Sequence, residues 1–362
     1  MYKHSITDKK RRLILASLIL ITTPFIYFTY VFTRPDTISH YNNDLTSNNS
    51  CFCNYLPIEQ PLEVKKEETS IDIKLPPLPQ ETTDKINGNL LKDRILIVAA
   101  ANYGMRNHVY NWIESLKRTE VTKFIIFCLD DKLYEHLILA GYDRQVAKIP
   151  DTWFHQQVEA SFSLYFSETY RIITHAKTLV VQQLLYLDIS VFFSDIDIVW
   201  IRPQIVEYMN TMMKMRPQTS VLFQQEGVDQ QEVNSGFYLM RPTAITKRLL
   251  AETIVIQDTN EKLTQQGAMN AALNKLDLDI RTTGVVLLDL LYFPNGHVYF
   301  NLDLPRQHGI KPFIVHANYL IGEDKKTKLM EQNMWYLNDT WLNEIDIKFE
   351  QHYVEPKSEN TA

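Results

Sequence analysis

Two aspartates separated by one residue are the sharpest chemical signal in this sequence. Asp195 and Asp197 follow the apolar pair Phe192-Phe193 and precede the apolar run 198–200. Paired carboxylates after a buried strand are typical of a site for a hard divalent cation, Mn²⁺ or Mg²⁺. Such a cation stabilises a diphosphate leaving group, because it neutralises the negative charge that develops as the bond to phosphate breaks. We therefore expect Asp195 and Asp197 to hold a metal ion and the phosphates of a substrate.

A histidine late in the chain is a candidate for the same metal site. His316 directly follows the apolar run 312–315, which is typical of a short buried strand. Because polar residues at strand ends gather at one edge of a parallel sheet, its imidazole can point into the same crevice. Manganese accepts an imidazole among oxygen ligands more readily than magnesium does. The alternative is a hydrogen-bonded structural histidine, and the position after a strand favours the ligand.

The apolar pattern predicts an α/β scaffold for these residues. The run 95–101 is typical of a buried parallel strand, residues 109–116 repeat apolar side chains at helical spacing, and 123–129 is a second buried strand. Further helices are expected at 134–140, 172–187, 244–256 and 268–276, and further strands at 146–149, 191–193, 221–223, 237–240, 285–288 and 313–315. Alternating elements predict an open, mostly parallel, Rossmann-like sheet with helices on both faces.

Ligands bind beyond the carboxyl ends of the strands in such a sheet, so the polar residues that follow a strand are candidates for the site. Asn102 and Tyr103 follow the first strand, and Asp130 follows the second. We expect Asn102, Tyr103 and Asp130 to line a nucleotide pocket, with the Tyr103 ring stacked on the base. A plain loop aromatic would give the same pattern at Tyr103.

Several ordered motifs resemble the nucleotide-diphospho-sugar transferase family. They span about residues 94–326 and comprise Lys177, the run 194–202, Asn234-Ser235-Gly236-Phe237, Phe293-Pro294-Asn295-Gly296, and His316-Ala317-Asn318-Tyr319 followed by Gly322 and Lys325 or Lys326. The resemblance implies a GT-A-type fold, Golgi residence, a manganese-dependent glycosyl transfer from a nucleoside-diphosphate sugar, and retention of anomeric configuration. The implied partners are that donor, with UDP favoured, and a glycan or glycoprotein acceptor.

The resemblance also implies roles for individual residues. Asp195 would contact the ribose or the cation, Asp197 would be the principal metal ligand, and His316 would complete the metal shell. Lys177 would pair with the diphosphate or the donor sugar; a solvated lysine on a helix is the alternative.

Three further residues would hydrogen-bond the hydroxyls of the donor sugar by the same resemblance. Asn234, Ser235 and Gly236 precede an expected strand, and Gly236 would let the backbone approach the ligand closely. An ordinary turn before that strand is the alternative.

One position departs from the family pattern. The family shows an acidic residue followed by glutamine, whereas this chain has Gln265-Gln266. The missing carboxylate would be a candidate to stabilise positive charge on the anomeric carbon. We therefore assign no catalytic base, and the departure puts the rate, the acceptor class or the activity itself in doubt.

The N-terminal region predicts a membrane anchor. Residues 13–32 are uncharged and long enough for the roughly 30 Å hydrocarbon layer, and the basic residues of 9–12 precede them. We expect a type II Golgi membrane protein with a cytosolic tail (1–12), a transmembrane signal-anchor (13–32), a flexible stem (33–90), a lumenal catalytic domain (91–350) and a tail (351–362). A cleaved signal peptide is the alternative, although this apolar stretch is longer than is usual for one.

Composition limits the remaining function classes. A formal charge of −6 and a pI near 6.0 argue against nucleic-acid binding. The competing functions are a haloacid-dehalogenase-like phosphatase, whose nucleophile loop also carries Asp-x-Asp, and a catalytically silent glycan-binding or scaffold protein of the same fold. Acceptor contacts are expected in the segments 151–169 and 226–233. Trp153 and Phe154 in the first segment are either sugar-stacking residues or a buried aromatic pair.

Overall fold

The computed structural model describes residues 78–150, 153, 168–260, 262–278 and 284–353. They belong to a compact unit that comprises Asp72–Ala362. The expected cytosolic tail, signal-anchor and most of the expected stem lie outside the described residues. Within the described ranges, no helix is both long and apolar enough to cross a bilayer.

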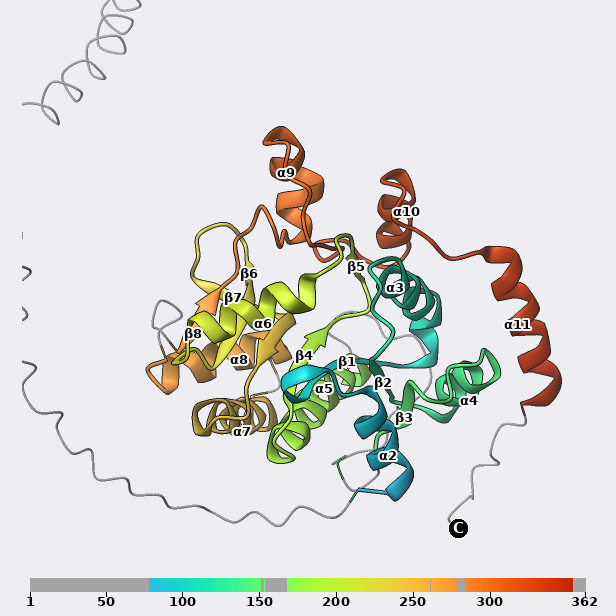
Figure 1. The fold of residues 1–362 in the computed structure, drawn as a ribbon, viewed down its shortest axis with the longest axis horizontal. Helices are drawn as coiled ribbons and strands as arrows, with labels where there is room; N and C mark the ends of the chain where they lie inside the picture. Colours follow the sequence, from blue (N-terminus) through green and yellow to red (C-terminus); the bar gives the residue numbers. More distant parts are fainter. Residues whose placement is uncertain (1–77, 151–152, 154–167, 261, 279–283, 354–362) are drawn as a thin grey trace, which may run out of the picture. The chain divides into compact units, whose positions relative to one another are not determined.

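A seven-stranded sheet forms the centre of this unit, with the strand order β3-β2-β1-β4-β7-β6-β8 (Figure 1). The strands are β1 (Ile95–Ala101), β2 (Ile125–Cys128), β3 (Val146–Lys148), β4 (Ser190–Ser194), β6 (Val221–Glu226), β7 (Glu232–Met240) and β8 (Val285–Leu287). Neighbouring strands are parallel except where β7 pairs antiparallel with β4 and with β6. The expected α/β fold with a mostly parallel sheet is confirmed.

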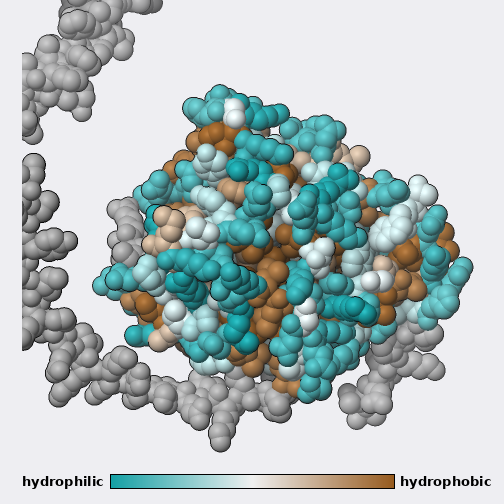
Figure 2. All heavy atoms as spheres, in the orientation of Figure 1, coloured by the Kyte–Doolittle hydropathy of each residue, from teal (hydrophilic) through white to brown (hydrophobic). Residues whose placement is uncertain are grey.

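Helices cover both faces of the sheet because its central strands are apolar on both faces. All seven residues of β1 are buried. Ile95 and Ile97 pack in one core cluster, and Leu96 and Val98 pack in the other. The first cluster includes α3 (Arg106–Arg118), α4 (Asp131–Leu139) and α6 (Ile205–Met215); the second includes α5 (Glu168–Tyr186), α7 (Ala244–Thr259) and α8 (Gln265–Lys275). The face shown in Figure 2 is mostly hydrophilic, with hydrophobic residues gathered toward its centre.

A second, two-stranded sheet brings the late histidine beside the two aspartates. The apolar stretch around Asp195 and Asp197 is not one strand: β4 ends at Ser194, and β5 (Ile198–Trp200) begins after a turn. β5 pairs antiparallel with β9 (Ile314–His316), and Ile198 lies opposite His316. This register places His316, which is more than a hundred residues further along the chain, next to the turn.

The folded unit begins earlier than the sequence pattern predicts. The expected stem extends to residue 90, but the structure contains helix α2 (Gln80–Asn89) there. Ile86 on this helix is 2% exposed and belongs to the core, and the Asn89 side chain donates a hydrogen bond to the Arg144 carbonyl at 2.7 Å. The helix was missed because Ile86 is its one large apolar residue, so no apolar face repeats along it.

The chain after residue 300 also contains helices that the apolar pattern did not predict. They are α9 (Leu304–Gln307), α10 (Glu323–Glu331) and α11 (Asp339–His352), preceded by a π-helical turn at His297–Asn301. Helix α11 passes the expected domain end at residue 350 by two residues. Helix α10 follows the β9 strand and carries Lys325.

Candidate functional site

A cavity of about 470 Å³ opens at the edge of the sheet where β1, β4 and β7 bring their polar residues together. Most of the site residues expected from the sequence line this cavity. They are Asn102, Lys177, Asp195, Asp197, Asn234, Ser235, Gly236 and His316. Tyr103 and Asp130 are absent from its lining.

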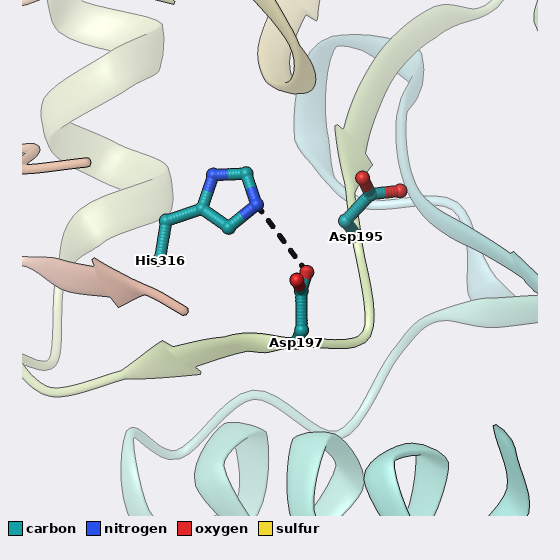
Figure 3. A group of neighbouring side chains, drawn as sticks. All are labelled: Asp195, Asp197 and His316. Carbon is teal, nitrogen blue, oxygen red and sulfur yellow. Dashed lines mark ion pairs between the residues drawn. The ribbon is translucent and has the colours of Figure 1, made fainter. Parts of the chain in front are cut away.

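Asp195, Asp197 and His316 form a compact group that can hold a metal ion. One ligand atom from each lies within 4.8 Å of the others, and Figure 3 shows the imidazole of His316 pointing at the Asp197 carboxylate. The Asp195 backbone N–H donates to the Gly236 carbonyl at 2.7 Å, and the Ala317 N–H donates to the Asp197 carbonyl at 3.0 Å. The turn between β4 and β5 is therefore held on two sides, so both carboxylates are positioned before any ligand binds.

The hydrogen bonds of Gln224 determine which nitrogen of His316 faces the carboxylates. The Gln224 amide nitrogen donates to the carbonyls of Phe293 at 3.1 Å and Pro294 at 3.0 Å. Carbonyls only accept, so the other end of the amide, Oε1, must face His316 Nδ1, which lies 2.7 Å away. Nδ1 therefore carries a proton, and the other nitrogen, Nε2, faces Asp197 Oδ1 at 3.3 Å. An imidazole that is oriented by a hydrogen bond at Nδ1 and faces a carboxylate with Nε2 is arranged as metal-binding histidines are.

Two lysines balance the charge of the carboxylates. Lys177 Nζ lies 2.5 Å from Asp195 Oδ1, and Lys325 Nζ lies 2.5 Å from Asp197 Oδ2. Burial by itself raises the pKa of Asp197, but the attraction of Lys325 and His316 outweighs burial and holds that pKa well below its ordinary value. Asp197 is therefore ionised at neutral pH and available to a cation.

Gly236 is required by the space around the metal-ligand group. A Cβ at this position would lie 2.7 Å from Asp195 Oδ2 and 2.8 Å from His316 Cε1. The close approach expected for this glycine is therefore an approach to the ligand side chains themselves. Any larger residue would push Asp195 or His316 out of position.

Amides and one further carboxylate line another part of the cavity. Asn234 Nδ2 donates to Glu226 Oε2 at 2.5 Å, and Asn234 Oδ1 accepts from the Gly236 N–H at 2.8 Å. The Ser235 N–H donates to Gln266 Oε1 at 3.2 Å. This part of the cavity therefore offers several neutral hydrogen-bonding groups together with the charge of Glu226.

The glutamine that replaces the family's acid is part of this lining. Gln265 is 4% exposed, and its Nε2 donates to Thr178 Oγ1 at 3.1 Å. A neutral side chain at this point leaves Asp195, Asp197 and Glu226 as the carboxylates in the cavity lining.

Gln224 was not predicted from the sequence as a site residue, and Glu226 was included only as the first residue of the segment 226–233 expected to contact an acceptor. Both follow the apolar run 221–223 on β6, so the rule that selected Asn102 and Asp130 would have selected them too.

The structure does not bring Tyr103 and Asp130 to the cavity. Asp130 begins helix α4, accepting from the Leu133 N–H at 2.7 Å, and it also accepts from the Tyr103 N–H at 2.8 Å. The Tyr103 ring stacks on Phe349 of α11, with centroids 5.7 Å apart. The prediction that Tyr103 stacks on a nucleotide base is wrong, because Phe349 of helix α11 already packs on its ring.

The sequence left two alternatives for Trp153, and the structure shows that it is a buried aromatic residue. It is 5% exposed, and its ring lies 6.2 Å from that of Phe127. Its neighbour Phe154 lies outside the described residues. Trp153 is therefore not available as a platform for a sugar.

Comparisons with known proteins agree on one enzyme family. The family model described as nucleotide-diphospho-sugar transferase matches residues 119–330. A UDP-galactose:fucoside alpha-3-galactosyltransferase of Dictyostelium discoideum is 28% identical over 297 residues, covering 71% of this chain and 45% of that protein. The UDP-D-xylose:L-fucose alpha-1,3-D-xylosyltransferase 3 of Arabidopsis thaliana is 25% identical over 286 residues, covering 72% of each.

The extent of these matches differs. The chain spans about half the length of the first curated relatives that it matches. Among solved structures, the glycosyltransferase GlyE of Streptococcus pneumoniae TIGR4 aligns with a TM-score of 0.44 at 14% identity, over 71% of this chain and 63% of that one. A structural similarity at this level supports no conclusion about function, so the family assignment rests on sequence similarity.

Proposed function

Because this chain belongs to the nucleotide-diphospho-sugar transferase family, we propose that it transfers a sugar from a metal-bound nucleoside-diphosphate sugar to an acceptor hydroxyl. The donor class that we propose is a UDP-sugar, and the names of the relatives suggest UDP-galactose or UDP-xylose, with an L-fucoside as the first acceptor to test. We also propose the GT-A type for the fold, in which the donor lies across the edge of the sheet.

The observation that carries the proposal is the group of Asp195, Asp197 and His316 beside two lysines in one cavity. A divalent cation held by these three side chains would supply Lewis-acid stabilisation of the departing diphosphate. The chemistry of the donor set, two carboxylates and one imidazole, suits manganese.

Charge balance explains why a cation and a diphosphate would bind together. Two carboxylates and two ammonium groups neutralise one another in the cavity. If Asp195 and Asp197 held a divalent cation, Lys177 and Lys325 would be released from their present ion pairs and could pair with the diphosphate of the donor. The pair adds no net charge to a buried site, so each should strengthen the binding of the other.

The remaining side chains suggest how transfer proceeds without a protein base. Asn234, Ser235 and Gln266 would hold the donor-sugar hydroxyls, while Gln265 offers a neutral group and no nucleophile. We propose that the acceptor oxygen bonds to the anomeric carbon on the face from which the phosphate leaves. The bond from that carbon to the phosphate oxygen breaks, and the same oxygen takes the acceptor proton. This route retains the anomeric configuration.

The cellular setting is part of the same proposal. We propose that residues 13–32 anchor the chain in the Golgi membrane as a type II protein, with 1–12 in the cytosol and the catalytic unit in the lumen. The basic residues before the apolar stretch support this orientation. We propose a shorter stem than the sequence pattern predicts, because helix α2 already packs on the catalytic unit.

The test is calorimetric titration of the full-length protein in detergent with UDP, with and without Mn²⁺. We expect Mn²⁺-dependent binding that Asp197→Asn abolishes. Asp130→Asn is the matched control, because it removes a carboxylate that also follows a strand, lies outside the cavity and retains a good helix-capping side chain. Binding of UDP by the folded protein that is independent of Mn²⁺ and of Asp197 would contradict the proposal.

A second measurement separates an enzyme from a silent relative. We expect slow hydrolysis of UDP-galactose or UDP-xylose by water in the presence of Mn²⁺, and faster release of UDP when an acceptor is added. Intact Mn²⁺-dependent binding with no turnover of any UDP-sugar would favour the silent scaffold.

A further inference from the structure

The outer part of the cavity carries a carboxylate and an exposed aromatic ring that the donor site does not use. Glu226 and Tyr319 line the cavity together, on segments that are far apart in the sequence. We infer that these two residues, the acceptor subsite, bind the acceptor as a sugar ring, with Glu226 on one of its non-reacting hydroxyls and Tyr319 against its apolar face. This inference rests on the proposed glycosyl transfer and specifies the class of acceptor.

The charge of Glu226 is the first argument. The other two cavity carboxylates each pair with a lysine, whereas Glu226 makes no ion pair with any residue that the structure describes. Its Oε2 accepts from the amides of Asn234 at 2.5 Å and Asn318 at 3.4 Å. A carboxylate held in place by neutral donors can accept a further strong hydrogen bond from a hydroxyl.

The backbone at Tyr319 is the second argument. Tyr319 has φ 62°, a left-handed conformation that bulky residues rarely adopt. Its hydroxyl accepts from the Gly227 N–H at 3.2 Å and hydrogen-bonds the Glu226 side chain. The ring is nevertheless 51% exposed. An aromatic side chain that is held in a strained conformation with half its surface in solvent is placed to contact a ligand rather than to pack in the core.

The neighbouring backbone is built to hold this segment in place. A Cβ on Gly296 would lie 1.9 Å from the Asn318 carbonyl oxygen, so the segment can lie here only because residue 296 is glycine. The Gly296 N–H also donates to Asn318 Oδ1 at 2.6 Å. Tyr319 is therefore fixed relative to Glu226 before a ligand arrives, which lowers the entropic cost of binding.

A sugar matches this pair of groups better than a protein side chain does. A pyranose presents an apolar face of C–H groups and a rim of hydroxyls, which suit a flat ring and an adjacent carboxylate. Ile321, which is 68% exposed and also lines the cavity, extends the apolar surface beside Tyr319.

The experiment compares transfer with donor binding in three variants of the full-length protein. Tyr319→Asn removes the ring and keeps a residue that tolerates the left-handed backbone; Tyr319→Phe keeps the ring; Glu226→Gln keeps the shape and removes the charge. Each is supplied with Mn²⁺ and labelled UDP-galactose or UDP-xylose, on an array of simple glycosides and, in parallel, on serine- and threonine-containing peptides. UDP affinity and hydrolysis of the donor by water are measured on the same samples.

We expect the wild type to label glycosides. In all three variants, the UDP affinity and the rate of donor hydrolysis should stay within about twofold of the wild-type values. Transfer to glycosides should fall on the order of tenfold or more in Tyr319→Asn, through the acceptor KM, and in Glu226→Gln. Tyr319→Phe should lose less than Tyr319→Asn. These outcomes together support a sugar acceptor at this subsite.

Three results would overturn the inference. The first is labelling of peptides but not glycosides. The second is an equal fall in hydrolysis and transfer, which would assign both residues to the donor. The third is unchanged transfer in Tyr319→Asn and Glu226→Gln. Absence of Mn²⁺-dependent UDP binding in the wild type would instead contradict the proposed function.

Discussion

Replacing Gln224 with leucine should weaken Mn²⁺ binding although Gln224 is not a metal ligand. Leucine has nearly the same size, but it removes the oxygen that lies 2.7 Å from His316 Nδ1. The imidazole is then free to rotate or to place its proton on Nε2, the nitrogen that faces Asp197. Loss of such a supporting hydrogen bond costs about 10- to 100-fold in metal affinity, or about 1.4 to 2.7 kcal/mol.

The assay is titration of the full-length protein with Mn²⁺, followed by electron paramagnetic resonance of the free ion. Gln225→Leu is the matched control, because Gln225 is also buried on β6 and its side-chain oxygen has no partner among the described residues. We expect Gln225→Leu to bind Mn²⁺ as the wild type does.

Stability has to be measured beside affinity in this experiment. Gln224→Leu also removes the Gln224 donor from the carbonyls of Phe293 and Pro294, and of these Pro294 keeps the His316 N–H at 3.4 Å, so we expect a cost of about 1 to 3 kcal/mol in the free energy of unfolding. Thermal unfolding without metal reports that cost separately. The reasoning would be refuted by a folded Gln224→Leu protein that binds Mn²⁺ within twofold of the wild type, or by an equal loss in Gln225→Leu.

Three further predictions concern the same cavity. Gly236→Ala should abolish Mn²⁺-dependent UDP binding while circular dichroism stays native, because the added Cβ would lie 2.7 Å from a carboxylate oxygen; normal UDP affinity would contradict this. Lys325→Ala should bind Mn²⁺ alone more tightly, because the ammonium group no longer competes for Asp197, but should bind UDP more weakly in the presence of Mn²⁺. A fall in both affinities would contradict the proposal that Lys325 leaves Asp197 to pair with the diphosphate. Burial lowers the pKa of His108 from 6.5 to about 4, so on acidification the unfolded chain takes up a proton at a higher pH than the folded protein does. The free energy of unfolding should therefore fall as the pH drops from about 6.5 to 4, by at most about 3 to 4 kcal/mol. His108→Gln should flatten that part of the pH profile, and an unchanged slope would show that His108 does not cause it.

Local pattern was sufficient for the elements of the sheet and for most of the metal group. The strands expected at 95–101, 123–129 and 191–193 are present, because parallel strands buried on both faces need continuous apolar runs. Asp195, Asp197 and His316 were selected because each lies at or just beyond the end of such a run. The rule that polar residues at strand ends are site candidates uses only the residues next to each other in the sequence. It can therefore be applied without knowing which strands are neighbours in the sheet.

The same rule failed where a later element covers the strand end. Tyr103 follows β1 as expected, but α11 places Phe349 on its ring. Helices α2 and α10 each bury one large apolar side chain, so their sequences lack a helical repeat. Helix α11 does repeat Leu342, Ile345 and Phe349 at helical spacing, but the sequence does not show which surface this face covers. Their positions follow from contacts with elements distant in the chain, which no local pattern contains.

The sequence by itself determined the α/β class, the family and the residue types that can hold a cation, because burial and chemistry act on each residue where it stands in the chain. The tertiary structure alone decided which of those residues meet. The pairing of β5 with β9 brings His316 to Asp197, and the side chain of Gln224 decides which imidazole nitrogen faces the carboxylate. Helix α10 brings Lys325 to the same carboxylate. The strained backbone at Tyr319 sets its ring beside Glu226. These are contacts across about a hundred residues of chain, and their geometry depends on strand register and packing rather than on composition.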